Sequence, residues 1–298
     1  MSITETSQEL AQREQALTAQ VSASFDQAGS ARTRQLLQSL VRHLHAFARE
    51  VRLTESEWRE AIDFLTRCGH ITDDRRQEFI LLSDVLGLSM LTVAINAPQD
   101  PAATEATVFG PFFVEGAQEV PFGGDIAEGV KGEPCWVEGR VTGVDGQPVS
   151  GAVLEVWEAD EDGFYDVQYD HGHTAGRAKT RTDADGRYGF WSVRPAAYPI
   201  PADGPVGDLL KAAGRGPMRP AHIHFMVSAP GFHTLITHAF PAGGPYLDDD
   251  AVFGVKESLV VDLAEHAAGR GPGGRELDGR WWQMVFDIRL VPTTGEIS

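Results

Sequence analysis

The sequence predicts an α+β protein, in which a helical N-terminal part is followed by an antiparallel β-sandwich. Apolar residues recur at helical spacing up to about residue 97. Beyond residue 130 the chain consists of short β-rich runs separated by turn signals, and five of its six tryptophans lie there. Because most of these runs have no helix between them, they favour an antiparallel sandwich over a parallel α/β sheet.

Three helices are expected in the N-terminal part. Residues 30–51 place leucine and phenylalanine on one helical face. Residues 54–70 open with Thr54 three positions before Glu57, which is the pattern of a capping box. A third, uninterrupted helix is expected over residues 73–97, because acidic residues stand at its start and a proline follows it.

The C-terminal part contains at least seven β-rich runs. Asp-Gly pairs at residues 145–146, 162–163 and 185–186 mark turns between or within them. The runs are CWVEGRVTGV, AVLEVWEAD, AKTRTDADGRYGFWSV, AHIHFMVSA, TLITHAF, ESLVVDL and WWQMVFDIRL. A link rich in Pro, Ala and Gly precedes them, so we expect a helical domain over residues 1–104 and a sandwich domain over residues 105–298.

Composition excludes some classes of partner. The chain has 43 acidic and 25 basic residues, a formal charge of -18, which offers no attraction to nucleic acid or to an acidic membrane. Its two cysteines, Cys68 and Cys135, lie far apart, which favours a reducing compartment over a disulfide framework. With no leader pattern and no run of roughly 18 apolar residues, we expect a soluble cytoplasmic protein.

A His-x-His pair stands within one of the β-rich runs. On a strand, His222 and His224 share a face and lie ~6.5–7 Å apart along it, so both imidazoles can reach one ion. Ile223, Phe225 and Val227 then face the opposite way, into the sandwich core. Structural, hydrogen-bonded histidines would explain the same pattern, so further ligands are needed.

Other candidate ligands near the pair are weak. His171 and His173 flank Gly172 in a polar stretch that suggests a loop, a poor place to preorganise ligands. No cysteine lies near either pair and no H-E-x-x-H is present, which removes the common zinc patterns. A two-histidine, one-carboxylate iron(II) site would need Glu155 or Glu158, whose strand looks structural.

Two tyrosines remain as candidates, Tyr165 after an Asp-Gly turn and Tyr198 in RPAAYPIPADGP. Free tyrosine titrates at about 10, so it binds as phenolate only to a strongly acidic ion such as Fe(III). A buried ring with a hydrogen-bonded hydroxyl is the alternative for each of them.

Several stretches together resemble the intradiol ring-cleavage dioxygenases, and most closely their hydroxyquinol-cleaving branch. These stretches are VFGPFF, DGFYD and RPAAYPIPADGPVGDLLKAAGRGPMRPAHIHFMVSAPG, and the resemblance extends over nearly the whole chain. It implies that Tyr165, Tyr198, His222 and His224 hold one non-haem Fe(III) per subunit. Tyr169 does not match the motif and is expected to be structural.

The resemblance also implies a reaction. A ring with two adjacent hydroxyls is cleaved between the hydroxylated carbons by O2, with Tyr198 leaving the metal and taking up a proton. Arg219 is implied to stabilise negative charge on the ring. His238 falls where relatives carry a polar residue behind the ligands, although a structural histidine remains the alternative.

The implied substrate pocket indicates which ring is cleaved. An acid in the apolar run FILLSDVLGL would be costly to bury without a hydrogen-bond donor, and a third substrate hydroxyl could supply one. A solvated helix face is the alternative for this acid, Asp84. We expect hydroxyquinol (benzene-1,2,4-triol) as substrate, with maleylacetate or 3-hydroxy-cis,cis-muconate as product, and catechol or a substituted catechol giving cis,cis-muconates as the alternative. The implied pocket residues are Leu81, Asp84, Val108, Phe109, Gly110, Pro111, Ile200, Pro201, Arg219 and Val252.

The resemblance further implies a homodimer through the N-terminal helices, with a phospholipid held between them. Two other classes of protein are alternatives. A non-catalytic transthyretin-like β-sandwich module would explain the strands around Tyr165, but neither Tyr198 nor the two histidines. A zinc hydrolase would use the histidines, but it has no need of two phenolates.

Overall fold

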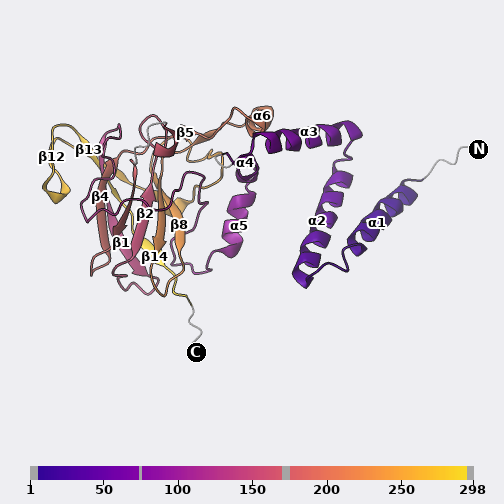
Figure 1. Ribbon diagram of the computed structural model, residues 1–298, viewed down its shortest axis with the longest axis horizontal. Helices are drawn as coiled ribbons and strands as arrows, with labels where there is room; N and C mark the ends of the chain where they lie inside the picture. Colours follow the sequence, from indigo (N-terminus) through magenta and orange to yellow (C-terminus); the bar gives the residue numbers. More distant parts are fainter. Residues whose placement is uncertain (1–5, 74–75, 170–174, 294–298) are drawn as a thin grey trace, which may run out of the picture. The chain divides into compact units, whose positions relative to one another are not determined.

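A computed structural model describes residues 6–73, 76–169 and 175–293 of the chain (Figure 1). The chain divides into two compact units, an N-terminal unit (Met1–Arg67) and a C-terminal unit (Cys68–Ser298). The helical part and the strand-rich part follow each other as the sequence predicts. The α+β fold class is therefore confirmed.

The N-terminal unit is built from helices. They are α1 (Ser7–Ala23), α2 (Ala31–Glu50) and the beginning of α3 (Glu55–Ile71). Thr6 and Glu9 cap α1 reciprocally, and the predicted capping box of α3 is present, since the Thr54 amide donates to Glu57 at 2.8 Å. An ion pair between Arg52 and Glu14, 2.7 Å long, ties the end of α2 to α1.

The prediction of one uninterrupted third helix is wrong, because this part of the chain forms two separate helices. Residues 72, 73, 76 and 77 are not helical, and two helices follow them, α4 (Glu78–Val85) and α5 (Leu88–Asn96). Gly87 separates them with a φ of 72°, a left-handed conformation that ends a helix and that glycine adopts without strain. Within the described residues no single helix meets the length and apolarity of a membrane span; α4 and α5 do so only as a pair bent by 78°.

The C-terminal unit holds the strands in two five-stranded sheets and two short ribbons (Figure 1). One sheet contains β10 (Leu263–His266), β13 (Trp281–Val285), β1 (Pro134–Gly143), β14 (Ile288–Leu290) and β4 (Arg187–Val193). The other has the order β3 (Arg177–Arg181), β2 (Val153–Trp157), β7 (Ile223–Ser228), β8 (Leu235–Pro241) and β9 (Val260–Val261). The ribbons pair β5 (Tyr198–Pro199) with β6 (Met218–Arg219), and β11 (Gly269–Arg270) with β12 (Glu276–Leu277).

Two details of this unit differ from the expectation. Most strand pairs are antiparallel as predicted, but β1 pairs in parallel with β13 and β14, and β8 with β9, so the sheets are mixed. A further helix, α6 (Pro205–Ala212), lies between β5 and β6. All three predicted Asp-Gly turns place their glycine at a φ between 76° and 84°.

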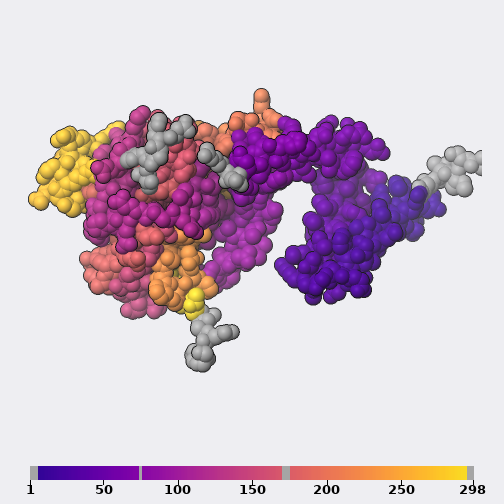
Figure 2. All heavy atoms as spheres, in the orientation of Figure 1, coloured from indigo at the N-terminus to yellow at the C-terminus, as the bar shows by residue number. Residues whose placement is uncertain are grey.

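The core lies between the two sheets. Cys135 and Val137 of β1 and Phe190 of β4 pack in one cluster with Leu154 of β2 and Phe225 of β7, all fully buried. The atoms of the C-terminal unit form one continuous body (Figure 2). Both cysteines are buried, and neither is in a disulfide.

Strand β7 alternates as the sequence predicts. Ile223, Phe225 and Val227 are fully buried in the core between the sheets. His224 points to the other side, where Met226 packs against an aromatic cluster that contains Tyr165 and Tyr198. One face of the strand is therefore structural, and the other face carries polar chemistry.

Candidate metal centre

Three strand pairings bring the predicted site residues together. β2 pairs with β7 so that Trp157 lies opposite His224, and β8 pairs with β7 so that His238 lies opposite His224 on its other side. The β5–β6 ribbon sets Tyr198 opposite Arg219. Tyr165 follows β2 after the Asp-Gly turn at residues 162–163. Residues from five strands and one turn thus lie close together.

Four donor atoms form a closed ring of short distances. Nε2 of His222 lies 3.2 Å from Nε2 of His224, which lies 3.0 Å from the Tyr165 hydroxyl. The Tyr165 hydroxyl donates to that of Tyr198 at 3.2 Å, and Tyr198 lies 3.5 Å from Nε2 of His222. Two nitrogens and two oxygens, from all four predicted ligands, therefore converge.

The spacing of these atoms fits a bound metal ion. Nitrogen and oxygen ligands lie about 2.0–2.1 Å from a small divalent ion, which puts two neighbouring ligands roughly 2.9–3.4 Å apart. The four separations in the ring run from 3.0 to 3.5 Å. The four donor atoms are therefore spaced about as the ligands of one ion would be.

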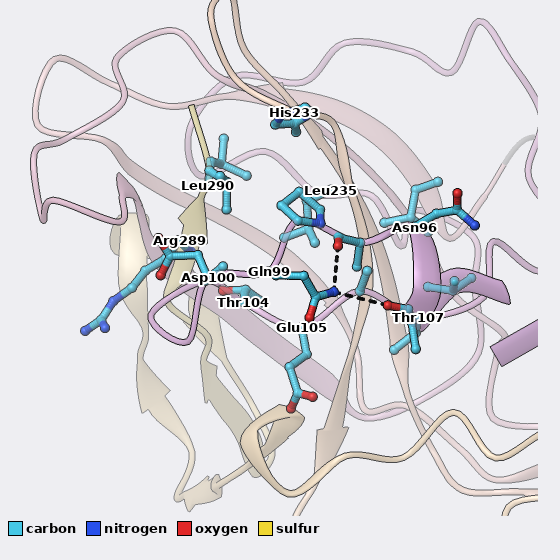
Figure 3. Close-up of a pocket in the computed structure, with 18 of the residues that line it drawn as sticks. Asn96, Gln99, Asp100, Thr104, Glu105, Thr107, His233, Leu235, Arg289 and Leu290 are labelled. Atoms are coloured by element: carbon cyan, nitrogen blue, oxygen red, sulfur yellow. Dashed lines mark hydrogen bonds between the residues drawn. The ribbon is translucent and has the colours of Figure 1, made fainter. Parts of the chain in front are cut away.

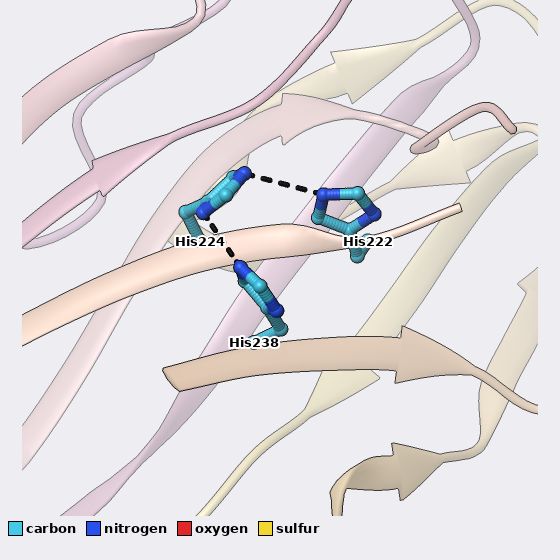
Figure 4. Close-up of side chains that lie close together, drawn as sticks. All are labelled: His222, His224 and His238. Carbon is cyan, nitrogen blue, oxygen red and sulfur yellow. Dashed lines mark hydrogen bonds between the residues drawn. The ribbon is translucent and has the colours of Figure 1, made fainter. Parts of the chain in front are cut away.

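Hydrogen bonds at the Nδ1 atoms orient the two imidazoles. Nδ1 of His222 lies 2.7 Å from the Pro220 carbonyl, to which it can only donate, so Nε2 carries the lone pair. Nδ1 of His224 lies 2.7 Å from Nε2 of His238 (Figure 4). Nδ1 of His238 lies 3.1 Å from the Thr107 hydroxyl. A chain Thr107–His238–His224 can hold the lone pair of His224 in the same direction.

His238 could itself be considered as a ligand. Ligand atoms of His222, His224 and His238 lie within 4.8 Å of one another, a spacing that permits a three-histidine metal site. However, Nε2 of His238 is hydrogen-bonded to Nδ1 of His224, on the side of that ring away from the tyrosines. This geometry favours a supporting role for His238 and leaves the tyrosine oxygens as the better partners of the two Nε2 atoms.

Burial sets the protonation of these groups. Burial lowers the pKa of His222, and the charge of Arg219 lowers it further. Burial also lowers the pKa of His224, and the neighbouring His222 adds to this effect. Both rings are therefore neutral and available as ligands. Burial also raises the pKa of the Tyr165 hydroxyl well above its ordinary value. Tyr165 consequently ionises at neutral pH only if a cation displaces its proton.

Arg219 lies against this ring of donors. Its Nη1 donates to Nε2 of His222 at 3.1 Å and lies 3.5 Å from the Tyr198 hydroxyl, while its Nε donates to Asp250 at 3.2 Å. Burial alone would lower its pKa, but Tyr198 and Asp250 keep the pKa above the ordinary value. Nη2 is buried with no partner among the described residues, so this cation has a donor left for a ligand.

Aromatic rings and a glycine close the sides of the centre. The Trp157 ring stacks on His224 at a centroid distance of 4.6 Å, and Phe112 stacks on Tyr165 at 4.5 Å. Gly110 touches His224 so closely that an added Cβ would lie 2.9 Å from Cε1 of the ring. Gly110 also has a φ of 78°, which makes a larger residue there doubly unfavourable.

Asp84 lies near the centre on the last turn of α4. Its carboxyl is buried, and this burial raises its pKa. A hydrogen bond from Ser89 and the positive charge of Arg219 lower the pKa, but by less than burial raises it. The charges of Arg219 and Asp250 both act on it. The alternative of a solvated helix face is therefore wrong, and the acid belongs to the surroundings of Arg219.

The remaining predicted pocket residues differ in how deeply they are buried. Val108, Ile200 and Val252 are buried, and the Phe109 ring lies 5.7 Å from that of Trp157. Leu81 is half-buried. Pro111 and Pro201 are exposed, and the described contacts do not link them to the four donors. Their role in substrate binding stays a prediction.

The weaker candidates lie outside the ring of donors. Glu155 pairs with Lys179 at 3.3 Å, and Glu158 accepts from Ser192 instead of facing the histidines. Tyr169 donates to Asp160, and this hydrogen bond raises its pKa to about 12. The pair at 171 and 173 lies outside the described residues.

Some residues of the centre were not found from the sequence. Thr107 and Asp250 act by hydrogen bonds to side chains more than thirty positions away, so no local pattern points to them. Trp157 could have been found, because it lies on β2 at the position opposite His224 once the strands are paired. Phe112 belongs to VFGPFF, which was recognised only as a motif.

A separate cavity of about 840 Å³ lies at the end of α5, beside the link before β1 and the ends of β8 and β14 (Figure 3). Polar side chains line it, including Gln99, Glu105 and Arg289, and Gln99 donates to the Ala97 carbonyl at 2.9 Å. None of the four donor residues lines this cavity. The cavity is therefore separate from the four donors, although Thr107, which hydrogen-bonds to His238, lies in its wall.

Comparison with known families agrees with this geometry. A family model described as the catechol dioxygenase N terminus matches residues 30–104, and one described as dioxygenase matches residues 108–292. The chain belongs to the intradiol ring-cleavage dioxygenase family and is an enzyme. The family and the histidine cluster indicate a metal cofactor, and the family's activity implies an aromatic substrate and O2.

Relatives within the family carry narrower names. The chain is 60% identical over 281 residues to hydroxyquinol 1,2-dioxygenase of Nocardioides simplex. The aligned residues cover 94% of this chain and 96% of that protein. It is 57% identical to 6-chlorohydroxyquinol 1,2-dioxygenase of Cupriavidus pinatubonensis, covering 93% and 97%. The crystal structure of hydroxyquinol 1,2-dioxygenase from Pseudomonas putida DLL-E4 matches with a TM-score of 0.90 and 45% identity, covering 95% of this chain and 100% of that one. The predicted family is confirmed.

Proposed function

We propose that this enzyme cleaves hydroxyquinol between its adjacent hydroxylated carbons, with O2 as co-substrate, to give 3-hydroxy-cis,cis-muconate, the enol form of maleylacetate. The observation that carries the choice of substrate is the buried Asp84 beside Arg219. A buried carboxyl needs hydrogen-bond donors, and the third hydroxyl of a triol is one that catechol lacks. Relatives of 56–60% identity named hydroxyquinol 1,2-dioxygenase support the same choice.

We propose that one Fe(III) per subunit is held by Tyr165, Tyr198, His222 and His224. Two phenol oxygens beside two neutral imidazoles form a donor set suited to a hard, strongly acidic ion, and that set is what the four converging side chains provide. Bound Fe(III) would supply the Lewis acidity that makes a chelated aromatic diol reactive toward O2.

The side chains of this protein then have separate tasks. The Tyr198 oxygen, which would be a phenolate when bound to the ferric ion, would accept a proton from an incoming hydroxyl, and the Arg219 guanidinium 3.5 Å away would stabilise the phenolate before that transfer. Arg219, with its free Nη2, stabilises negative charge on the bound ring. His238, backed by Thr107, keeps His224 in the orientation that directs Nε2 toward the tyrosines.

The substrate ring is proposed to lie beside these groups in a pocket formed by residues of α4, the link before β1, the segment after β5 and the loop around Val252. Gly110 packs against the His224 ring, and Val108 is buried in the same link. The Val252 amide donates to Asp250 at 3.3 Å. Leu81, Phe109, Pro111, Ile200 and Pro201 complete the proposed set.

Substrate preference is tested directly by oxygen uptake. We expect kcat/KM for hydroxyquinol to exceed that for catechol and methylated or chlorinated catechols, with an equimolar consumption of O2 and a ring-opened dicarboxylate as product. A higher kcat/KM for catechol than for hydroxyquinol would instead assign the enzyme to the catechol-cleaving branch.

Replacing Asp84 with alanine is expected to lower kcat/KM for hydroxyquinol by about tenfold or more, since a hydrogen bond to a charged group contributes ~1.5–3 kcal/mol. The loss for catechol should be clearly smaller, because catechol has no third hydroxyl. Steady-state kinetics with both substrates measures the difference. Asp63→Ala is the matched control, because Asp63 is an exposed aspartate on a helix, α3. Equal losses for the two substrates would refute the role of Asp84.

We also propose a homodimer through the helical domain of residues 1–104, with the catalytic sandwich in residues 105–298. Leu36, Leu40, Leu44 and Phe47 of α2 are each more than half exposed, which supports a partner on this face. A phospholipid between the helices and a cytoplasmic location complete the proposal. The two cysteines are buried and not in a disulfide, which accords with a reducing compartment. Sedimentation velocity and lipid extraction test the assembly and the lipid separately.

A further inference from the structure

The side chain of Arg215 joins two segments that are far apart in the sequence. Its Nη1 donates to the Val85 carbonyl, the last of α4, at 2.6 Å. Its Nη2 donates to the Ala251 carbonyl at 3.0 Å. Arg215 itself follows α6 and is half-buried. One guanidinium therefore fixes the end of a helix to a loop of the C-terminal unit.

The contact with α4 satisfies a helix terminus. The last carbonyls of a helix have no partner within the helix, and a cation there is also favoured by the helix dipole. Beyond Val85 the chain cannot continue the helix, because Gly87 is left-handed. The last turn of α4 thus depends on Arg215 for a hydrogen bond that the helix cannot provide.

A ring reinforces the same link. The Arg215 guanidinium lies 4.7 Å from the centroid of the Phe253 ring. A Cβ added to Gly87 would lie 3.5 Å from that ring, so the backbone between α4 and α5 packs on it. Phe253 holds a φ of 59°, a conformation uncommon for a residue with a side chain. The loop is therefore fixed in a specific shape at its contact with Arg215.

One of the two joined segments carries Asp84, which binds the third hydroxyl in the proposed function, and the other carries Asp250, the partner of Arg219. Asp84 directly precedes Val85. In the loop, Asp250 directly precedes Ala251 and accepts from Arg219, and its other oxygen accepts from the Gly254 amide at 2.8 Å. Arg215 and Arg219, four positions apart, thus hold the same loop, but of these two only Arg215 hydrogen-bonds to α4 in the described structure.

We propose that Arg215 is a positioning residue for substrate selectivity. By tying Val85 to Ala251, it sets the separation between Asp84 and the Arg219–Asp250 pair, and therefore how well a third ring hydroxyl fits between them. Arg215 does not touch the substrate; it acts through Asp84. This inference rests on the proposed role of Asp84 in binding hydroxyquinol.

The kinetic test uses Arg215→Met, which keeps most of the length of the side chain and removes both hydrogen bonds. We expect KM for hydroxyquinol to rise about tenfold, with kcat and the kcat/KM for catechol changed by less than about threefold. In an Asp84→Ala background, Arg215→Met should cause little further loss of selectivity, because the two residues act as a unit. Full additivity of the two changes, or equal losses for both substrates, would overturn the proposal.

A second readout does not depend on turnover. Hydrogen exchange of backbone amides in residues 78–85 is expected to be faster in Arg215→Met than in the wild type, with Arg215→Lys intermediate because lysine can bridge less well. Arg187→Met, a change of an exposed arginine on β4, is the matched control. Unchanged hydrogen exchange in α4 would contradict the proposal that Arg215 holds the end of this helix. If Asp84→Ala alone leaves selectivity intact, the proposed function of Asp84 fails, and the exchange result still decides whether Arg215 holds α4.

Discussion

The variant His224→Ala is expected to fold but to lose its iron, and its turnover of hydroxyquinol should fall by more than about 100-fold. Loss of a residue that only supports a metal ligand already costs ~10–100-fold in metal affinity or activity. His224 provides one of the four converging donors and contacts Tyr165, Trp157 and His238. Iron content per subunit and kcat/KM, measured on the same preparation, check this expectation.

A matched control for this variant exists elsewhere in the sandwich. His266 on β10 is also stacked on a tryptophan, Trp281, at 4.1 Å, but it bonds to Gln283 and lies outside the ring of donors. His266→Ala should keep full iron content and activity. If His224→Ala retained one iron per subunit and normal turnover, His224 would not be a ligand.

Arg219→Met should lower kcat/KM by about 10²–10³, the range observed when one charge-stabilising donor is removed from an active site. Iron content should be unchanged, because Arg219 donates to the site and offers no lone pair to a metal. Its raised pKa keeps the wild-type side chain charged across the assay range, so the loss should not depend on pH. Kinetics together with iron analysis measure both effects.

The interpretation of Arg219 depends on keeping these effects separate. Arg187→Met again serves as the control for a lost surface arginine. A variant that loses iron in proportion to its activity would show that Arg219 maintains the architecture of the site. In that case its role in stabilising charge on the ring would be refuted.

The fold was predictable where short-range patterns determine it. The capping box at Thr54 and the alternation of β7 follow from periodicity and side-chain chemistry alone, and both are present. The break at Gly87 was missed, because a single glycine in an apolar helical pattern does not reveal its φ. The parallel pairing of β1 with β13 was also missed, since register between distant strands depends on packing across the whole sheet.

The candidate site was predictable to a similar degree. Its four donors are marked by motifs, and the structure places all four within hydrogen-bonding distance of a neighbour. Thr107 and Arg215 could not be found from the sequence. Thr107 supports a histidine 131 positions away, and Arg215 binds carbonyls that every residue possesses, so neither leaves a residue-specific signal.

The visible absorption spectrum of the iron-replete protein tests the central claim most directly. Tyrosinate bound to Fe(III) gives a charge-transfer colour, so we predict a coloured protein. The band should be lost or shifted in Tyr165→Phe and Tyr198→Phe, and unchanged in Tyr169→Phe, whose hydroxyl bonds to Asp160. A colourless protein with one Fe(III) per subunit would contradict the assignment of the two tyrosines as ligands.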